Sequence, residues 1–139
     1  CIRDRANTAT GGHAIGDIIS GFERIFGSNH DDALTGDAGN NRLYGYAGND
    51  TLDGGAGNDV LRGGNGSDTF VFSSGSDALD GGAGGDIALF DGDLADFDVI
   101  NEGAGEWTIS NTATGDVSTL VSVETLTFND GSVTYLDFV

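Results

Sequence analysis

Aspartate recurs at nine-residue intervals through the middle of this chain, and carboxylates at so regular a spacing are candidate ligands for a cation. Residues 27–89 divide without insertion or deletion into seven nine-residue units, GSNHDDALT, GDAGNNRLY, GYAGNDTLD, GGAGNDVLR, GGNGSDTFV, FSSGSDALD and GGAGGDIAL. Most units carry Gly at the fourth place, Asp at the sixth and Leu at the eighth. The sixth places are held by Asp32, Asn41, Asp50, Asp59, Asp68, Asp77 and Asp86. Self-similarity at a fixed short period predicts a stacked repeat architecture.

Each unit is expected to form a tight turn followed by a short strand. Gly and Asn adopt positive φ at low cost, so the first six residues of a unit such as Gly54–Arg62 can make a turn whose carbonyl groups converge. The last three residues are strand-like, and the eighth-place side chain points inward. Two units complete one coil of 18 residues. The predicted core residues are Leu34, Leu43, Leu52, Leu61, Phe70, Leu79 and Ala88.

Stacking brings the acidic side chains of alternate units together. One edge of the stack receives Asp32, Asp50, Asp68 and Asp86, and the other receives Asn41, Asp59 and Asp77. Neighbouring strands lie about 4.8 Å apart, and like charges at roughly 5 Å repel by about 3 kcal/mol per pair at an effective dielectric constant of about 20. A counterion is therefore needed.

The oxygen-rich turns favour calcium as that counterion. Carbonyl and carboxylate oxygens form a flexible cage that suits Ca²⁺, whereas Mg²⁺ prefers a smaller octahedral site and keeps its waters. Zinc and copper prefer His or Cys, and the turns offer only His30.

The charge of the chain excludes several classes of partner. Its 23 acidic and 5 basic residues give a formal net charge of −18. Nucleic-acid binding depends on Lys and Arg that neutralise phosphates, and anionic membrane surfaces attract basic segments, so neither is an expected partner. No apolar run approaches the roughly 18 residues that a membrane-spanning helix needs, so no membrane insertion is expected. The periodic spacing of the 25 Gly residues argues for an ordered fold over a flexible linker.

The pattern GGxGxDxUx, in which U is a large apolar residue, resembles the calcium-binding nonapeptide of the RTX (hemolysin-type) family. The match covers residues 27–89 and is strongest in GGAGNDVLR, residues 54–62. The resemblance implies an all-β fold, a right-handed parallel β-roll in which each Ca²⁺ lies between successive coils on one edge. It also implies a ligand set of sixth-place carboxylates from Asp32, Asp50, Asp59, Asp68, Asp77 and Asp86. The implied main-chain carbonyls of the first four places are those of Gly45, Ala47, Gly48, Gly54, Gly55, Ala56, Gly57, Gly63, Gly64, Asn65, Gly66, Ser74, Gly75, Gly81, Gly82, Ala83 and Gly84.

The resemblance also ranks the sites, and we expect about three to five ions. The best pairs are Asp50 with Asp68 and Asp59 with Asp77, followed by Asp32 with Asp50 and Asp68 with Asp86. Asn41 lacks the charge, His30 replaces the fourth-place Gly, and Phe72-Ser73 replaces a Gly pair. Sites that touch these residues should be weaker or empty.

Three regions follow one another along the chain. Residues 1–26 form a lead-in that includes a degenerate first coil, with Gly21, Glu23 and Ile25 at the fourth, sixth and eighth places. Residues 27–89 form the β-roll. Residues 90–139 are expected to form a β-rich capping segment, which resembles the segment that often follows RTX repeats in exported proteins. Its strands are expected near 96–101, 106–110, 118–121, 124–128 and 132–136 as a small antiparallel meander, because terminal repeats must be atypical to stop the stack from propagating.

The residues favour a binding role over catalysis. Neither HExxH nor GxSxG is present, His13 and His30 read as surface turn residues, and Trp107 reads as a packed residue of the cap. The chain is therefore not expected to be an enzyme, and the start at Cys1 favours a fragment of a longer protein.

The RTX resemblance implies a secreted, extracellular bacterial protein that passes through a type I secretion apparatus. Its repeats would fold on Ca²⁺ outside the cell and support secretion, folding and stability of a larger exported protein. The alternative is a carbohydrate- or surface-binding module of an RTX enzyme or adhesin, with a polysaccharide or a cell surface as its partner.

Overall fold

The computed structural model describes residues 17–18 and 24–136, and within them nearly all regular structure is β. One short 3-10 turn, η1 (Leu94–Asp96), separates the repeats from the cap. The strands are β1 (Asp17–Ile18), β2 (Ile25–Phe26), β3 (Ala33–Thr35), β4 (Arg42–Ala47), β5 (Thr51–Asp53), β6 (Val60–Asn65), β7 (Thr69–Phe72), β8 (Ala78–Ala83), β9 (Ile87–Phe90), β10 (Phe97–Gly103), β11 (Glu106–Asn111), β12 (Val117–Val121), β13 (Thr125–Phe128) and β14 (Val133–Tyr135).

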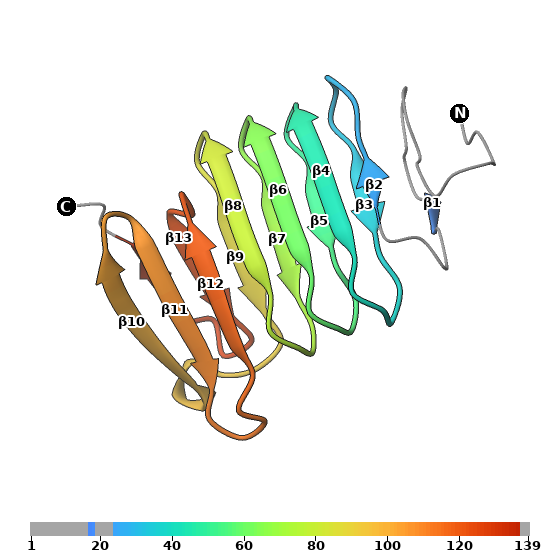
Figure 1. Ribbon diagram of the computed structural model, residues 1–139. Coiled ribbons are helices and arrows are strands. Elements are labelled where there is room, and N and C mark those ends of the chain that lie inside the picture. The colour runs from blue at the N-terminus through green and yellow to red at the C-terminus, as the bar shows by residue number, and fades with distance from the viewer. Residues whose placement is uncertain (1–16, 19–23, 137–139) are drawn as a thin grey trace.

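The strands of the repeats stack into two facing parallel sheets (Figure 1). Strands β3, β5, β7 and β9 are successive neighbours in one sheet, and β2, β4, β6 and β8 are successive neighbours in the other. The register is constant, because Leu34 pairs with Leu52, Leu52 with Phe70, and Phe70 with Ala88. This register confirms a parallel β-roll in which one coil contains two nine-residue units.

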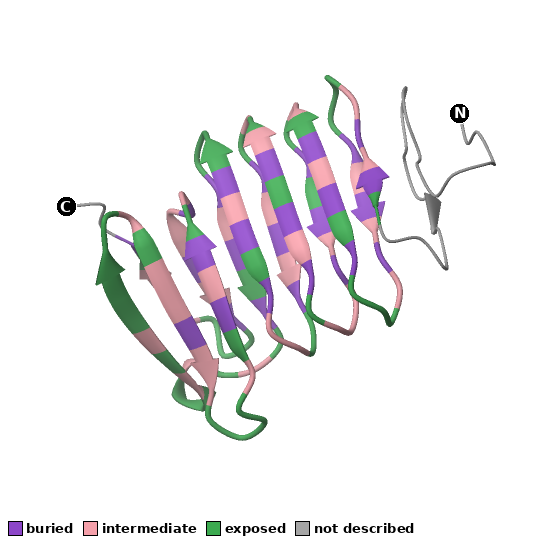
Figure 2. Ribbon diagram, in the orientation of Figure 1, coloured by how far each residue is buried: buried purple, intermediate pink, exposed green. Residues whose placement is uncertain are grey.

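The eighth-place side chains fill the space between the two sheets. The predicted core residues are all buried, namely Leu34, Leu43, Leu52, Leu61, Phe70, Leu79 and Ala88. Figure 2 shows the buried positions lying level with one another from coil to coil. The apolar column continues past the repeats, since Ile25 pairs with Leu43 at one end and Leu120 pairs with Leu79 at the other.

The C-terminal cap contains the five expected strands, but their pairing corrects the predicted meander. Strand β12 pairs in parallel with β8, and β13 pairs in parallel with β9. These two strands therefore form a last, shortened coil of the roll, joined by residues 122–124. The β10–β11 hairpin adds to β12 in antiparallel fashion, and β14 adds to β13 in the same way. The physical reason is that Leu120 and Leu126 both face inward and extend the core column.

Part of the predicted lead-in can be placed. Strand β1 pairs in parallel with β3, and β2 pairs in parallel with β4. The other residues predicted for this region and for the two ends of the chain lie outside the described residues, namely Cys1, His13, Gly21, Glu23 and residues 137–139. Within the described part, no helix is long and apolar enough to cross a membrane.

Candidate metal centre

The sixth-place side chains form a buried hydrogen-bonded ladder along each edge of the roll. All seven are at most 5% exposed, although six of them are aspartates. On one edge, the main-chain N–H of Asp32 donates to Oδ1 of Asp50 at 2.8 Å, and Asp50 N–H donates to Oδ1 of Asp68 at 2.8 Å. On the other edge, Asp59 N–H donates to Oδ1 of Asp77 at 2.9 Å. One oxygen of each accepting carboxylate thus fixes the distance between coils.

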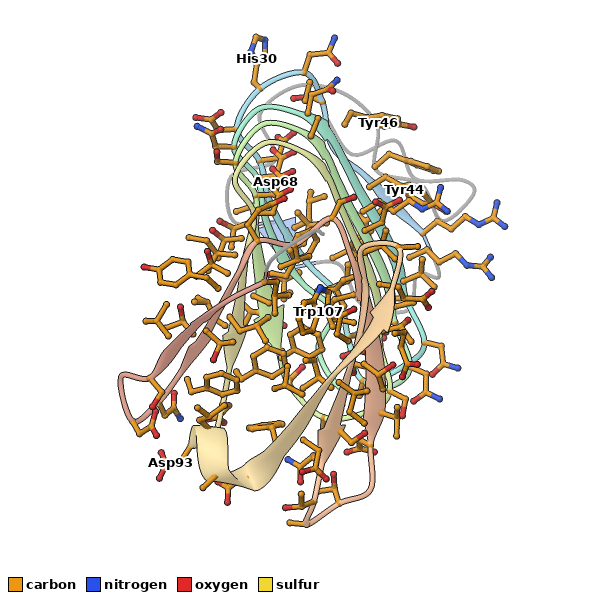
Figure 3. All side chains as sticks on the ribbon, turned by 90° about the vertical axis from the view of Figure 1, so that its left-hand side faces the viewer. His30, Tyr44, Tyr46, Asp68, Asp93 and Trp107 are labelled. Carbon is orange, nitrogen blue, oxygen red and sulfur yellow. The ribbon has the colours of Figure 1, made fainter. Side chains whose placement is uncertain are left out.

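The second carboxylate oxygen has no such partner. Among the described residues, Oδ2 of Asp50, Asp59, Asp68 and Asp86 is buried without a hydrogen bond. A buried, unpaired oxygen of this kind costs free energy unless a cation or donor reaches it. Figure 3, a view along the stack, shows Asp68 inside the curve of the turns, whereas His30 lies at their outer tip.

The first-place glycines leave a space between these oxygens and the next coil. A Cβ on Gly45 would lie 2.7 Å from the carbonyl oxygen of Gly63 and would also meet Oδ2 of Asp50. A Cβ on Gly63 would lie 2.8 Å from the carbonyl oxygen of Gly81 and would meet Oδ2 of Asp68. All the oxygens around each of these two spaces are hydrogen-bond acceptors, and a cation between them would convert their repulsion into attraction.

The chemistry of this donor set fits calcium. No group of three His, Cys, Asp or Glu side chains gathers among the described residues, so main-chain carbonyls must supply most of the ligands. A cage of carbonyl oxygens with one or two carboxylates is typical of Ca²⁺, which accepts six to eight oxygens in flexible geometry. When bound, the ion would neutralise the row of carboxylates and join one coil to the next.

Burial also raises the pKa of these carboxylates above that of an ordinary aspartate. It raises the pKa of Asp50, Asp59 and Asp86 to about 6, although the ladder hydrogen bonds oppose that rise. The neighbouring carboxylates contribute to this rise in pKa, with Asp68 acting on Asp50 and Asp77 acting on Asp59. Burial raises the pKa of Asp68 and Asp77 as well. The metal-free roll therefore disfavours the charged form that would bind an ion.

The Asn41 turn shows which oxygens converge on such a space. Its amide nitrogen donates to the carbonyl oxygen of Gly39 at short distance, to Oδ1 of Asp37 at 3.2 Å and to the carbonyl of Gly54 at 3.5 Å. The amide thus takes the place that a cation would take between two coils. This arrangement gives a physical reason for the expectation that the Asn41 site is weak or empty.

The Asp32 turn differs in another way. Oδ2 of Asp32 accepts hydrogen bonds from the main-chain N–H of Ser28 at 2.6 Å and from its hydroxyl at 2.9 Å. The site between Asp32 and Asp50 therefore has less need of a cation than the sites further along the same edge.

The remaining predicted ligands lie partly in the turns and partly at the C-terminal ends of β4, β6 and β8, which are six residues long and extend beyond the three-residue strands expected from the sequence. The third-place carbonyls of Asn65, Ser74 and Ala83 accept main-chain hydrogen bonds from Gly48, Gly57 and Gly66, at 2.8 to 3.0 Å. The other predicted third-place residues are Ala47 and Ala56, and the second-place glycines with positive φ are Gly55, Gly64 and Gly82. Of the six fourth-place glycines in residues 27–89, all but Gly39 have positive φ, namely Gly48, Gly57, Gly66, Gly75 and Gly84.

Aromatic residues replace the first-place glycines near the cap on the edge that carries Asp59 and Asp77. Phe72 is 6% exposed and stacks on Phe90 with ring centroids 4.2 Å apart. Phe90 in turn stacks on Phe128 at 5.2 Å. Hydrophobic packing therefore closes this edge at the point where the sequence predicts weaker ion binding.

Two residues that the sequence reasoning missed end the ladders. Ser118 Oγ accepts the N–H of Asp77 at 3.0 Å, and Oε2 of Glu124 accepts the N–H of Asp86 at 2.6 Å. The sequence does contain a signal for Glu124. Residues Glu124-Thr125-Leu126 have the same order of acid, Thr and Leu as Asp50-Thr51-Leu52.

The repeats match the model of a known family. The RTX calcium-binding nonapeptide repeat matches in four overlapping copies, at residues 26–61, 35–70, 44–79 and 53–88. The crystal structure of the extracellular lipase LipA from Serratia marcescens is similar, with a TM-score of 0.48 and 20% identity over 76% of this chain and 14% of that chain. A search of curated proteins finds no match. Residues 26–88 are therefore RTX calcium-binding nonapeptide repeats.

Proposed function

We propose that this chain is a non-catalytic module that folds when it binds calcium outside the cell and supports the export, folding and stability of a larger bacterial protein. The observation that carries the proposal is the set of buried Oδ2 atoms of Asp50, Asp59, Asp68 and Asp86, which have no hydrogen-bond donor. Those of Asp50, Asp68 and Asp86 also lie beside main-chain carbonyl oxygens of the next coil. RTX repeats occur in secreted bacterial proteins.

The energetic argument links calcium to folding. Buried carboxylates at successive positions destabilise the metal-free roll, and an ion that binds only the folded state adds its binding free energy to folding. Cytosolic Ca²⁺ is scarce, so the chain would stay unfolded while it passes through a type I secretion apparatus. It would then fold in the calcium-rich medium outside.

Circular dichroism and a secretion assay test the two halves of this proposal. The chain is expected to gain β structure when millimolar Ca²⁺ replaces EDTA, and equal structure in both conditions would overturn calcium-dependent folding. The export half is tested by fusing the chain to the C-terminus of a passenger protein in cells with and without a type I apparatus. Equal amounts of fusion protein in both media would overturn that half.

A second candidate function rests on a cationic, aromatic face on the outside of one sheet. Three of the five basic residues, Arg24, Arg42 and Arg62, are exposed there. The Arg62 guanidinium carbon lies 5.9 Å from the centre of the Tyr44 ring. Tyr44 and Tyr46 both project from this side of the roll (Figure 3). Such a concentration of positive charge is unexpected on a chain of net charge −18.

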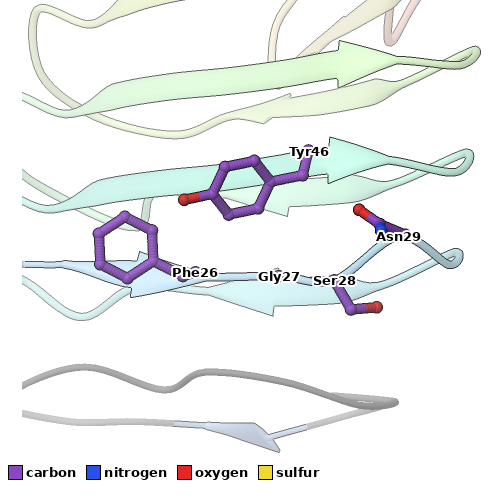
Figure 4. Close-up of a pocket in the computed structure, with 5 residues that line it drawn as sticks. All are labelled: Phe26, Gly27, Ser28, Asn29 and Tyr46. Atoms are coloured by element: carbon purple, nitrogen blue, oxygen red, sulfur yellow. The ribbon is translucent and has the colours of Figure 1, made fainter.

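The aromatic part of this face forms a continuous stack beside a surface hollow. Phe26 stacks on Tyr44 with centroids 5.1 Å apart and on Tyr46 with centroids 6.2 Å apart. Phe26, Gly27, Ser28, Asn29 and Tyr46 line the hollow, which has a volume of about 540 Å³ (Figure 4). Flat rings can pack against sugar rings, and arginines bind carboxylates through paired hydrogen bonds. This face therefore suits a polysaccharide that contains uronic acids.

Binding of the calcium-loaded chain to a uronic-acid polymer tests this second candidate. Arg42→Gln and Tyr46→Ala should each weaken binding, whereas Tyr135→Ala, which removes a ring that is 75% exposed on β14 of the other sheet, should not. Equal binding by all three variants would contradict an assignment to this face, and tighter binding to a neutral polymer would contradict the role of charge.

A further inference from the structure

The row of sixth-place carboxylates does not end with the last nonapeptide. Glu124 continues it, because Oε2 of Glu124 accepts the N–H of Asp86 at 2.6 Å, as Oδ1 of Asp86 accepts the N–H of Asp68 at 2.7 Å. The main-chain pairing also continues, since the N–H of Thr125 donates to the Asp86 carbonyl at 3.1 Å. Glu124 thus occupies the sixth place of the shortened coil that β12 and β13 form.

The space between Asp86 and this last coil has the same oxygens as the spaces within the repeats. Asp86 is 0% exposed, and its Oδ2 has no hydrogen-bond partner. A Cβ on Gly81 would lie 2.5 Å from this Oδ2 and would also meet the carbonyl oxygen of Ser122. Ser122 therefore supplies the carbonyl that a first-place glycine supplies in the earlier coils.

The backbone of the shortened turn is held in an unusual conformation at this point. Ser122 has φ of +52°, which a non-glycine residue rarely adopts. The bond from Asp86 to Glu124 uses Oε2, which leaves Oε1 available to a ligand. The turn thus places a carbonyl beside the buried Oδ2 of Asp86 and a carboxylate beside the main-chain N–H of the same residue.

We propose that a further Ca²⁺ binds in this space, held by Oδ2 of Asp86, the main-chain carbonyl of Ser122 and the carboxylate of Glu124. The inference rests on calcium binding by the repeats, which is the proposed function, and adds an ion site outside the nonapeptide pattern. This ion joins the last repeat to the cap. Ordering of the cap therefore becomes dependent on calcium even though the cap contains no nonapeptide.

Crystals of the full chain grown with Tb³⁺ in place of Ca²⁺ locate the ions directly. Anomalous density between Asp86 Oδ2 and the Ser122 carbonyl is the expected result. Density at the Asp50 and Asp68 sites without density at this position would overturn the further inference and leave the proposed function intact. Absence of any bound ion would instead overturn the proposed function.

A charge-neutral variant tests the same site in solution. Glu124→Gln should bind one ion fewer by native mass spectrometry, and Glu102→Gln, the same change at an exposed position of β10, should bind the wild-type number. Trp107 is the sole tryptophan and lies in the cap, so its fluorescence reports ordering of the cap. The calcium midpoint of that signal should rise at least about tenfold in Glu124→Gln, in line with the loss of one metal-site interaction. An unchanged ion count or an unchanged midpoint would contradict the assignment.

Discussion

The main-chain N–H of Asp50 donates to Oδ1 of Asp68 at 2.8 Å, although 18 residues separate them. The bond uses one oxygen of the carboxylate to hold two coils together and leaves Oδ2 of Asp68 buried without a donor. A single residue type therefore serves both the spacing of the coils and the binding of an ion. This dual use couples the stacking of the coils to the metal site at Asp68.

Replacement of Asp68 by Asn should separate them. In Asp68→Asn the amide oxygen can still accept the N–H of Asp50, while the amide nitrogen can donate to the carbonyls that Oδ2 faces, as Asn41 does in its own turn. The variant should bind fewer calcium ions by native mass spectrometry, yet its residual structure in EDTA should equal or exceed that of the wild type. Asp98→Asn is the matched control, because Asp98 is exposed on β10. An unchanged ion count in Asp68→Asn would show that its carboxylate is not a ligand.

The dependence of stability on pH should change sign when calcium is added. Burial raises the pKa of Asp50, Asp59 and Asp86 to about 6, from 3.8 for an ordinary aspartate. Without calcium the folded state binds more protons than the unfolded state between these values, so its stability should fall as the pH rises from about 4 to about 6 and should stay low above that.

With calcium, protons and ions compete for the same carboxylates. The calcium concentration at the folding midpoint should therefore be higher at a pH of about 5 than at about 7.5. Calcium titrations followed by circular dichroism at both pH values measure the shift in the midpoint. In EDTA, the folded state should instead be more stable at the lower of the two pH values. Identical calcium midpoints at the two values would contradict the assignment of these aspartates as ligands.

Two adjacent glycines offer a matched test of the turn. Gly84 has φ of +154°, and a Cβ there would collide with the carbonyl of Gly66 in the preceding coil. A Cβ on Gly85 would meet only Ser67 Oγ, at 3.7 Å. In saturating calcium, Gly84→Ala should lower the free energy of unfolding by at least about 1–3 kcal/mol, and Gly85→Ala should change it by no more than about 0.5 kcal/mol. Urea unfolding compares the two, and similar losses in both would show that coil stacking does not depend on the fourth place.

The repeat itself was predictable from sequence, because the nine-residue period determines the core positions, the edge positions and the length of a coil. The spacing of Leu52 and Asp50 determines which side chain faces the core and which lies at the edge, and the structure places both as expected. The pairing of β12 and β13 was not predictable from that period. The β10–β11 hairpin separates them from the repeats, and their connecting turn is three residues long, so the nine-residue spacing is lost although Leu120 and Leu126 keep the core register.

Residue types alone also could not predict which positions need a cation. Asp32 has the sixth-place carboxylate, but hydrogen bonds from Ser28 already satisfy its Oδ2. Glu124 lacks the nonapeptide around it, but its carboxylate reaches the N–H of Asp86. Local hydrogen-bond geometry therefore decides which positions of the row need a cation.

Asn41→Asp should create an ion site where the natural chain has an amide. The Asn41 nitrogen now donates to Gly39 and Asp37 and approaches the Gly54 carbonyl. An aspartate would replace these donations by repulsion among oxygens, in a side chain that is only 2% exposed. The variant should therefore bind one more calcium ion than the wild type and should lose structure in EDTA.

The same reasoning predicts a steeper dependence of folding on calcium concentration, because each added ion that binds only the folded state increases that slope. Native mass spectrometry measures the ion count, and circular dichroism measures the slope. Asn40→Asp is the matched control, because it adds the same charge at the exposed neighbouring position. An Asn41→Asp variant with the wild-type ion count and wild-type stability in EDTA would show that the amide does not stand in for a cation at this turn.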